Sequence, residues 1–365
     1  MNKPYIKDGT IFLPDINSPT IDKMNSAIND NKSVLEGKQE KLTPGKGINI
    51  EYKNGKYIIS CNVDPYSGEV EERRSIKILH VGNSYMRDAT SYIVPLLREL
   101  LPNVDVTIGI IHVDGCSQQR YHEEIFPRDY AQVFDYVNKL SWQRKISNYP
   151  LFEQGSTSYT PVFDLAEWDV VTFQQRSGMA GTYETYQPYL RQNIKTIYDH
   201  LPKSCRLTWF IGMPRIEANV SDVGISMFEG AAGCARKVLE ESACEDILPC
   251  GTAVQNLRTI PAFAAMGEQG GMQTANHLQT GIGMLAEGYV YILWIARMLG
   301  LPIGVYGSKY RPVDGDARVT HGINGSTAPD GITDENCRLA QIAAMHAIKR
   351  PFEITDMTDE VESNS

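Results

Sequence analysis

Ser84 and His277 are the residues whose types and settings could carry out covalent chemistry. Ser84 follows Gly82 and Asn83 in HVGNSYMRDAT, where an apolar run turns into an expected helix. A serine in such a turn presents its hydroxyl at the edge of a sheet, where it can act as a nucleophile. His277, in GGMQTANHLQT, lies in a loop before a long expected helix and could accept the serine proton. Each residue has an ordinary alternative, since serine is a favoured helix N-cap and a lone histidine is usually structural.

Two further positions could stabilise an oxyanion. Gly115 in HVDGCSQQRYH allows its backbone N–H to approach a ligand closely, although a simple turn would also favour glycine there. Gln174 or Gln175, in TFQQRSG, could donate a side-chain amide to the oxyanion; the alternative is a polar strand end that bonds neighbouring loops. The positions matter together, because they follow separate strands whose carboxyl ends would meet at one edge of a sheet.

The elements that must position these residues alternate between strands and helices over residues 72–350. Short apolar runs, typical of a parallel sheet buried on both faces, cover 76–82, 104–113, 169–175, 206–213 and 246–254. Helical patterns cover 91–101, 183–201, 225–242, 282–299 and 335–348. Residues 116–168 form a long insertion, expected to be helical in part and close to the site. The pattern predicts an α/β fold: a three-layer, doubly wound parallel sheet with sites at the carboxyl ends of its strands.

Residues 1–70 have a different pattern and are expected to form a separate segment for attachment or oligomerisation. Four apolar residues recur there at seven-residue intervals, which fits either a short coiled-coil seam or an amphipathic surface helix. They are Ile21, Ile28, Leu35 and Leu42. Asn54 and Gly55 then separate two alternating runs, which predicts a β-hairpin. A hairpin and a short helix cannot bury a core alone, so this segment needs the main domain or copies of itself. The main domain is placed at 71–350 and an acidic tail at 351–365.

Composition excludes several classes of function. The 365 residues carry 35 basic and 44 acidic side chains, a net charge of −9, which argues against nucleic acid as the main partner. The sequence contains no apolar run long enough to span a membrane, and its first residues lack the apolar core of a secretory signal. The seven cysteines show no C-x-x-C or zinc-type spacing, which favours free thiols made in a reducing compartment such as a bacterial cytoplasm.

The residues at the four positions 84, 115, 174–175 and 277 resemble the site residues of the SGNH (GDSL-like) serine hydrolases, and the resemblance covers roughly residues 75–350. The resemblance implies a flavodoxin-like fold, Ser84 as nucleophile, His277 as base, and an oxyanion hole from Gly115 with Gln174 or Gln175. It implies no metal and no organic cofactor. The family places an aspartate three residues before the histidine, and this chain has Thr274 there. A backbone carbonyl, Asn276 or an acid from another loop would have to orient His277 instead.

The run KQEKLTPGKGINIEYKNGKYIIS resembles segments that recur in bacteriophage tail fibres and other virion appendages, which are typically homotrimers. Together the two resemblances imply a virion-borne esterase that removes small O-acyl groups, acetyl above all, from a host surface polysaccharide. The implied partners are that polysaccharide, other virion proteins and further copies of the chain, without nucleic acid or membrane insertion. The alternatives are a decayed glycan-binding or structural virion module, favoured by Thr274, and an intracellular lipase-like enzyme.

Overall fold

The structure is a computed structural model. It describes residues 5–7, 10–12, 48–53, 56–61, 74–127, 133–138, 142–145, 163, 166–214, 221–264, 277–302, 304–317, 329 and 331–362. The chain forms two compact units, Met1–Glu71 and Glu72–Ser365.

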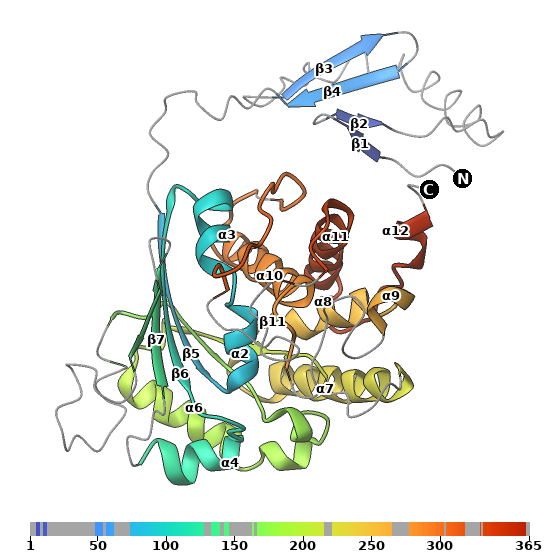
Figure 1. Ribbon diagram of the computed structural model, residues 1–365. Coiled ribbons are helices and arrows are strands. Elements are labelled where there is room, and N and C mark those ends of the chain that lie inside the picture. The colour runs from blue at the N-terminus through green and yellow to red at the C-terminus, as the bar shows by residue number, and fades with distance from the viewer. Residues whose placement is uncertain are drawn as a thin grey trace, which may run out of the picture. The chain divides into compact units, whose positions relative to one another are not determined.

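Five parallel strands form the centre of the larger unit (Figure 1). They are β5 (Arg74–Gly82), β6 (Val104–His112), β9 (Val170–Phe173), β10 (Arg206–Phe210) and β11 (Cys244–Leu248). Their spatial order is β11-β10-β9-β5-β6, and helices cover both faces, which confirms the predicted three-layer α/β fold. The order reverses at β5, so the carboxyl end of β5 is the switch point at which open α/β sheets bind ligands.

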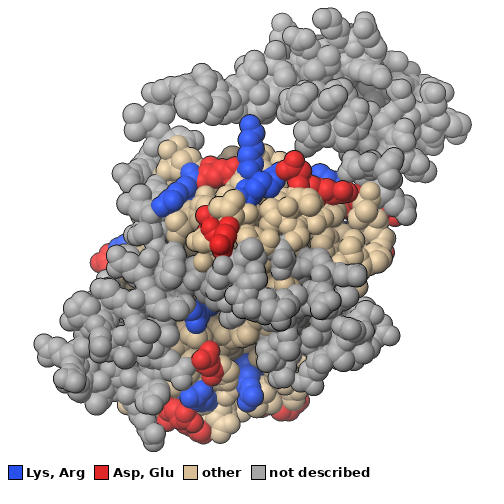
Figure 2. Space-filling model, in the orientation of Figure 1, with Lys and Arg blue, Asp and Glu red and all other residues tan. Residues whose placement is uncertain are grey.

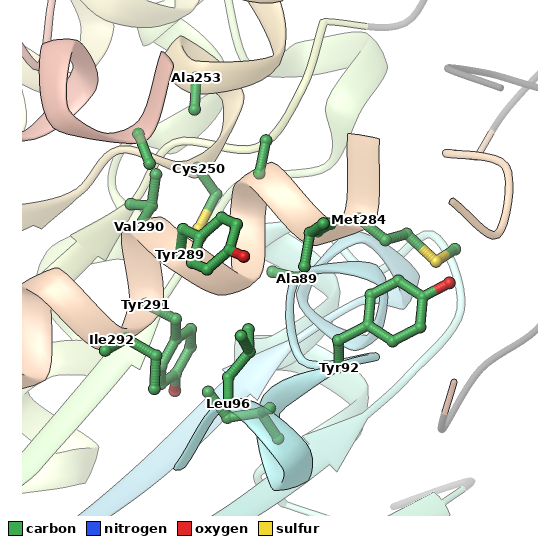
Figure 3. Close-up of a cluster of buried hydrophobic side chains, with 14 of the residues drawn as sticks. Ala89, Tyr92, Leu96, Cys250, Ala253, Met284, Tyr289, Val290, Tyr291 and Ile292 are labelled. Atoms are coloured by element: carbon green, nitrogen blue, oxygen red, sulfur yellow. The ribbon is translucent and has the colours of Figure 1, made fainter. Parts of the chain in front are cut away.

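One face of the sheet carries five helices. These are α2 (Ser84–Ala89), α3 (Ile93–Leu100), α8 (Cys250–Leu257), α10 (Ile282–Met298) and α11 (Asp334–Lys349). Every residue from Ile282 to Ala296 of α10 is buried, as expected for a helix that is apolar on all sides. Figure 3 shows Met284 and Tyr291 of this helix packed near Ala89 and Leu96. The helix α10 therefore holds α2, which carries Ser84, against the sheet.

The opposite face carries α4 (Gln118–Arg120), the π-helical turn η1 (Tyr121–Ile125), α6 (Tyr189–His200) and α7 (Ser221–Glu241). Trp209 of β10 is buried in this core and meets the rings of Phe173 and Tyr186. Two short turns, η2 (Ser177–Met179) and η3 (Tyr183–Tyr186), precede α6, whereas α9 (Pro261–Ala264) follows α8 and packs Phe263 into the core of the α10 face. The tail after residue 350 packs against the larger unit before α12 (Thr358–Glu362) begins, because Met357 is buried.

Three of the expected elements differ from the observed ones. The helix expected over 183–201 is a short turn, Tyr183–Tyr186, followed after Pro188 by α6, which begins at Tyr189. The run 246–254 was expected to be a single strand, yet β11 ends at Leu248 and α8 begins at Cys250. A short apolar run cannot distinguish a strand from a buried helix, and Pro249 separates the two elements. The insertion contains more than helix, because two strands extend the sheet there: β7 (Val133–Asn138) pairs antiparallel with β6, and β8 (Trp142–Lys145) pairs antiparallel with β7.

The smaller unit contains the expected hairpin. Strands β3 (Ile48–Lys53) and β4 (Lys56–Cys61) pair antiparallel across Asn54 and Gly55. A second pair, β1 (Tyr5–Lys7) with β2 (Thr10–Phe12), was not expected. The seven-residue repeat from Ile21 to Leu42 lies outside the described residues, so the helix expected there stays a prediction.

Six cysteines of the larger unit are buried free thiols. They are Cys116, Cys205, Cys234, Cys244, Cys250 and Cys337. Burial raises the pKa of the Cys116 and Cys205 thiols to about 12. Acidic and basic residues are interspersed over the part of the surface that Figure 2 colours. Within the described part of the chain, every helix is too short or too polar to cross a membrane.

Candidate active site

Ser84 begins helix α2 at the switch point of the sheet and is half-buried. The helix starts here because Asn83 has extended backbone and its side chain accepts the N–H of Tyr85 at 3.2 Å. Gly82 ends the strand, and a Cβ there would lie 2.9 Å from Sδ of Met86, so a larger residue would displace the Met86 side chain. Thus Asn83, not Ser84, is the N-cap, and the ordinary alternative for Ser84 does not hold.

His277 contacts the helix that Ser84 begins. Its Nδ1 lies 3.0 Å from Oδ2 of Asp88, which also accepts the N–H of Leu278 at 3.4 Å. Asp88 is 1% exposed and stands four residues after Ser84, one turn along the same face of α2. The ring of His277 also meets the edge of the Tyr85 ring, with centroids 5.6 Å apart. Ser84 and His277 are therefore both positioned by the short helix α2.

Asp88 is a candidate site residue that sequence reasoning did not name. The sequence left open a backbone carbonyl, Asn276 or an acid from another loop in place of the aspartate expected at Thr274. Thr274 and Asn276 both lie outside the described residues. The acid comes from another element, and its sequence signal was its spacing from Ser84, because i and i+4 share a helix face.

Asp88 sets the charge state of His277. Burial would lower the pKa of the imidazole, but the hydrogen bond and the negative charge of Asp88 raise it, and the balance lies above the ordinary value. Asp114 adds to the increase, whereas the Arg87 cation opposes it. With Nδ1–H donated to Asp88, the other ring nitrogen is the one that can accept a proton.

The loops after the strands are tied together by buried amides. Nε2 of Gln174 donates to Oδ1 of Asn83, next to Ser84. Gln118 donates its side-chain amide to the Gln174 carbonyl at 2.8 Å, and Asn193 of α6 donates to Gln118 at 2.8 Å. Gln175 uses its oxygen to accept the N–H groups of Gln118 and Arg176, each at 2.9 Å. This network fixes the loops after β5, β6 and β9 with respect to one another.

The two glutamines have different surroundings. The Gln175 amide nitrogen donates to the carbonyl and hydroxyl oxygens of Thr185, so its hydrogen atoms are both used within the protein. Gln174 keeps one amide hydrogen beyond its bond to Asn83 and is the one beside Ser84. Of the two alternatives for an oxyanion donor, the geometry favours Gln174.

Gly115 lies in an exposed turn after β6 with φ of 56°. A side chain there would meet open space, so the requirement for glycine is the left-handed backbone and not crowding. The preceding Asp114 lies 3.0 Å from Nε2 of buried His112, and Arg87 of α2 lies 3.4 Å from the other ring nitrogen. These contacts connect the Gly115 turn to the helix of Ser84.

Some predicted contacts are outside what the structure shows. Within the described part of the chain the Ser84 hydroxyl makes no hydrogen bond, so direct proton transfer from Ser84 to His277 stays a prediction. Catalytic hydrogen bonds are often long in empty sites and shorten when substrate binds.

Comparison with known proteins places the fold and leaves the activity open. The crystal structure of a DUF4886 family protein from Bacteroides uniformis ATCC 8492 matches 78% of this chain and 99% of its own, with a TM-score of 0.60 and 22% identity. A gut microbial diltiazem-metabolizing enzyme matches 62% of this chain and 48% of its own, with a TM-score of 0.36 and 11% identity, which is too low to support an argument. No family model matches the sequence, and no curated protein matches it. The solved structures therefore support the α/β fold alone.

Proposed function

We propose that this chain is a serine ester hydrolase in which Ser84 is the nucleophile, His277 the base and Asp88 the residue that orients it. The observation that carries the proposal is the 3.0 Å contact between His277 and Asp88, made on the helix that Ser84 begins. A serine, an imidazole and a buried carboxylate are the three groups of a serine triad, which is recognised by geometry and not by chain position.

The reaction proceeds by acyl transfer. His277 takes the proton of Ser84 as the serine oxygen attacks the ester carbonyl, and the backbone N–H groups of Ser84 and Gly115 with the Gln174 amide stabilise the oxyanion. The carbon–oxygen bond to the alcohol then breaks, and the alcohol leaves with the proton from His277. Water, deprotonated by His277, releases the acyl group and regenerates Ser84.

The finer proposal is that the substrate is a small O-acyl group on a carbohydrate of a host cell surface, and that the protein acts on a phage virion as a homotrimer. Its support is sequence resemblance. The residues at positions 84, 115, 174–175 and 277 support the esterase, and the run KQEKLTPGKGINIEYKNGKYIIS supports the virion appendage. The acidic chain agrees with a partner other than nucleic acid.

The competing proposal is a glycan-binding or structural virion module whose site has decayed. Thr274 was its main support, and Asp88 weakens it because His277 has a carboxylate partner from another element. Turnover separates the two proposals. Purified protein should release acetate from acetylated host polysaccharides and from a small acetyl ester, and Ser84→Ala should reduce both to background. Equal rates for wild type and Ser84→Ala would favour the binding module.

A further inference from the structure

His112 is a buried histidine to which the proposed reaction gives no role. It ends strand β6 beside Gly82 of β5, and its side chain is 2% exposed. Ile108 and Ile110, four and two positions earlier, lie in the core of the α10 face. Because side chains alternate along a strand, the His112 ring lies on that face too. Its two nitrogens therefore depend on neighbouring protein groups for their partners.

Two charged side chains determine the tautomer of this ring. Nη1 of Arg87, on helix α2, lies 3.4 Å from Nδ1, and Oδ1 of Asp114 lies 3.0 Å from Nε2. A guanidinium can only donate and a carboxylate can only accept, so Nδ1 is the acceptor and the ring proton belongs on Nε2. The neutral His112 ring therefore bridges helix α2 and the turn that follows β6.

The turn that this ring reaches carries Gly115. The N–H of Cys116 donates to the Val113 carbonyl at 3.2 Å, which closes the turn with Asp114 and Gly115 at its tip. Because Gly115 has no side chain, the Asp114 carboxylate is the group through which the tip can be held. The Asp114 side chain is 73% exposed, yet it lies against the buried His112 ring. The connection from the tip of the turn to α2 therefore runs through His112.

We propose that His112 is a positioning residue for the oxyanion hole, which it serves by holding the Gly115 turn against helix α2; the inference rests on the proposed function. The oxyanion needs the N–H of Ser84, at the start of α2, and the N–H of Gly115 to point at one place. Arg87 stands three residues after Ser84, so Arg87, His112 and Asp114 connect the two donors. Misplacing such a group by about 1 Å can cost roughly 10²-fold in rate.

The test compares two variants of His112 in the hydrolysis of 4-nitrophenyl acetate by the full chain. His112→Phe keeps a flat ring but removes both nitrogens. It should reduce kcat by about 10–100-fold and change KM by less than about twofold, because oxyanion donors act in the transition state. His112→Gln supplies one acceptor and one donor and should recover part of the loss. Rates are taken on the alkaline plateau of the pH profile, where His277 is neutral.

His80→Phe is the matched control. His80 is a fully buried histidine of β5 whose Nδ1 contacts the Thr172 hydroxyl and whose ring meets Tyr291 of α10. The substitution removes both nitrogens from a buried ring of the same core, but it leaves the contacts of His112 in place. The variant should lose stability and retain kcat. Equal losses of kcat from His80→Phe and His112→Phe would overturn the positioning role.

Asp114→Ala covers the case in which His112→Phe does not fold, because the Asp114 side chain is exposed and its loss should leave the melting temperature unchanged. It should reduce kcat by a similar factor, and the double variant should lose no more than the larger single loss, because the two residues act as a unit. Wild-type kcat in the folded variants, or a loss carried by KM, would overturn the positioning role alone. Equal rates for wild type and Ser84→Ala would overturn the proposed function and the positioning role together.

Discussion

Asp88 is a buried carboxylate, and its hydrogen bonds must offset the free-energy cost of removing its charge from water. It is 1% exposed, and its Oδ2 accepts both the Leu278 N–H and the His277 ring. Burying a charge without partners costs free energy. A carboxylate held in this way therefore has a structural or a functional role in the fold. In a serine hydrolase it fixes the histidine tautomer and stabilises the imidazolium that forms as the serine attacks.

Asp88→Asn should therefore decrease kcat by about 10³–10⁴-fold, because the wrong imidazole tautomer would face Ser84. The measurement is hydrolysis of a small acetyl ester, with Ser84→Ala as the zero. Thr274→Asp should change the rate little, since Asp88 already orients His277. Asp246→Asn, which removes a carboxylate bonded to Trp294 and Arg297 far along the chain, is the control and should retain kcat. Full activity of Asp88→Asn would contradict the triad.

The pH profile provides a second test of the same contact. The base must be neutral to accept a proton, so kcat/KM should fall as pH decreases through the raised pKa of His277. Conservative removal of the Asp88 charge takes away what raises that pKa, and the acid limb of Asp88→Asn should move to lower pH. An acid limb at the same pH in both proteins would show that another group controls it.

The sequence predicted the four site positions but not the carboxylate of Asp88. Ser84, Gly115, Gln174 and His277 follow apolar runs, and parallel topology brings the ends of such runs to one edge. Asp88 follows no strand. Its role depends on a helix that starts at Ser84, and the expected helix of this region began only at residue 91.

The helices of the α10 face decide how the site is held. Glu287 on α10 is 1% exposed, and among the residues that the structure describes neither of its carboxyl oxygens has a hydrogen-bond partner. Burial raises its pKa well above the ordinary value, the nearby Asp88 charge raises it further, and Arg258 opposes the rise. Burial therefore favours the uncharged form of the Glu287 carboxyl group.

Glu287→Gln should stabilise the protein, and the gain should grow with pH. The unfolded chain ionises Glu287 above about pH 4.3, while the folded protein cannot until its raised pKa is passed. Between those two points wild type loses about 1.4 kcal/mol per pH unit from this group, a loss that the variant lacks. Urea unfolding at pH 4 and pH 8 measures the difference. Glu335→Gln, at an exposed position of α11, is the control and should show no such growth.

Two glycines on neighbouring helices provide a matched test of backbone packing. A Cβ on Gly251 of α8 would lie 2.0 Å from the Gly212 carbonyl oxygen, whereas one on Gly233 of α7 would meet nothing within 4 Å. Gly251→Ala should cost about 3 kcal/mol of folding free energy. Gly233→Ala should gain up to about 1 kcal/mol through helix propensity. Similar melting temperatures for the two variants would contradict the close approach of α8 to the loop after β10.

The elements that were not predicted share a physical reason. The run 246–254 is apolar throughout, and burial on both faces gives a strand and a core helix the same pattern. The strand VFDYVN was not predicted within the insertion, because a strand is fixed by its partner, and only the fold brings this one beside β6.

The whole molecule comprises two units of different character. The larger buries two apolar layers around its sheet, while the smaller contains two short hairpins among its described residues. Hairpins of this size are marginally stable alone, which favours assembly of the smaller unit with copies of itself.

Ile28→Asp should dissociate the protein, because a charge in the proposed seam would be buried among apolar side chains. Native mass spectrometry should show a trimer for wild type and a monomer for the variant. The Glu72–Ser365 unit should keep its melting temperature and its esterase rate in both. A monomeric wild-type chain would contradict the assembly.

The reaction rates of the buried thiols can report how often the larger unit opens. A thiolate must form before a cysteine reacts, and burial has made this unfavourable at the described positions. Cys250 and Cys337 belong to the core on the α10 side, and Cys205 and Cys244 to the core on the α6 side. With Cys61 replaced by serine, the rate at which a thiol reagent labels each pair would report how often each layer separates from the sheet. Each layer would be followed through its own cysteines, without introducing a new one.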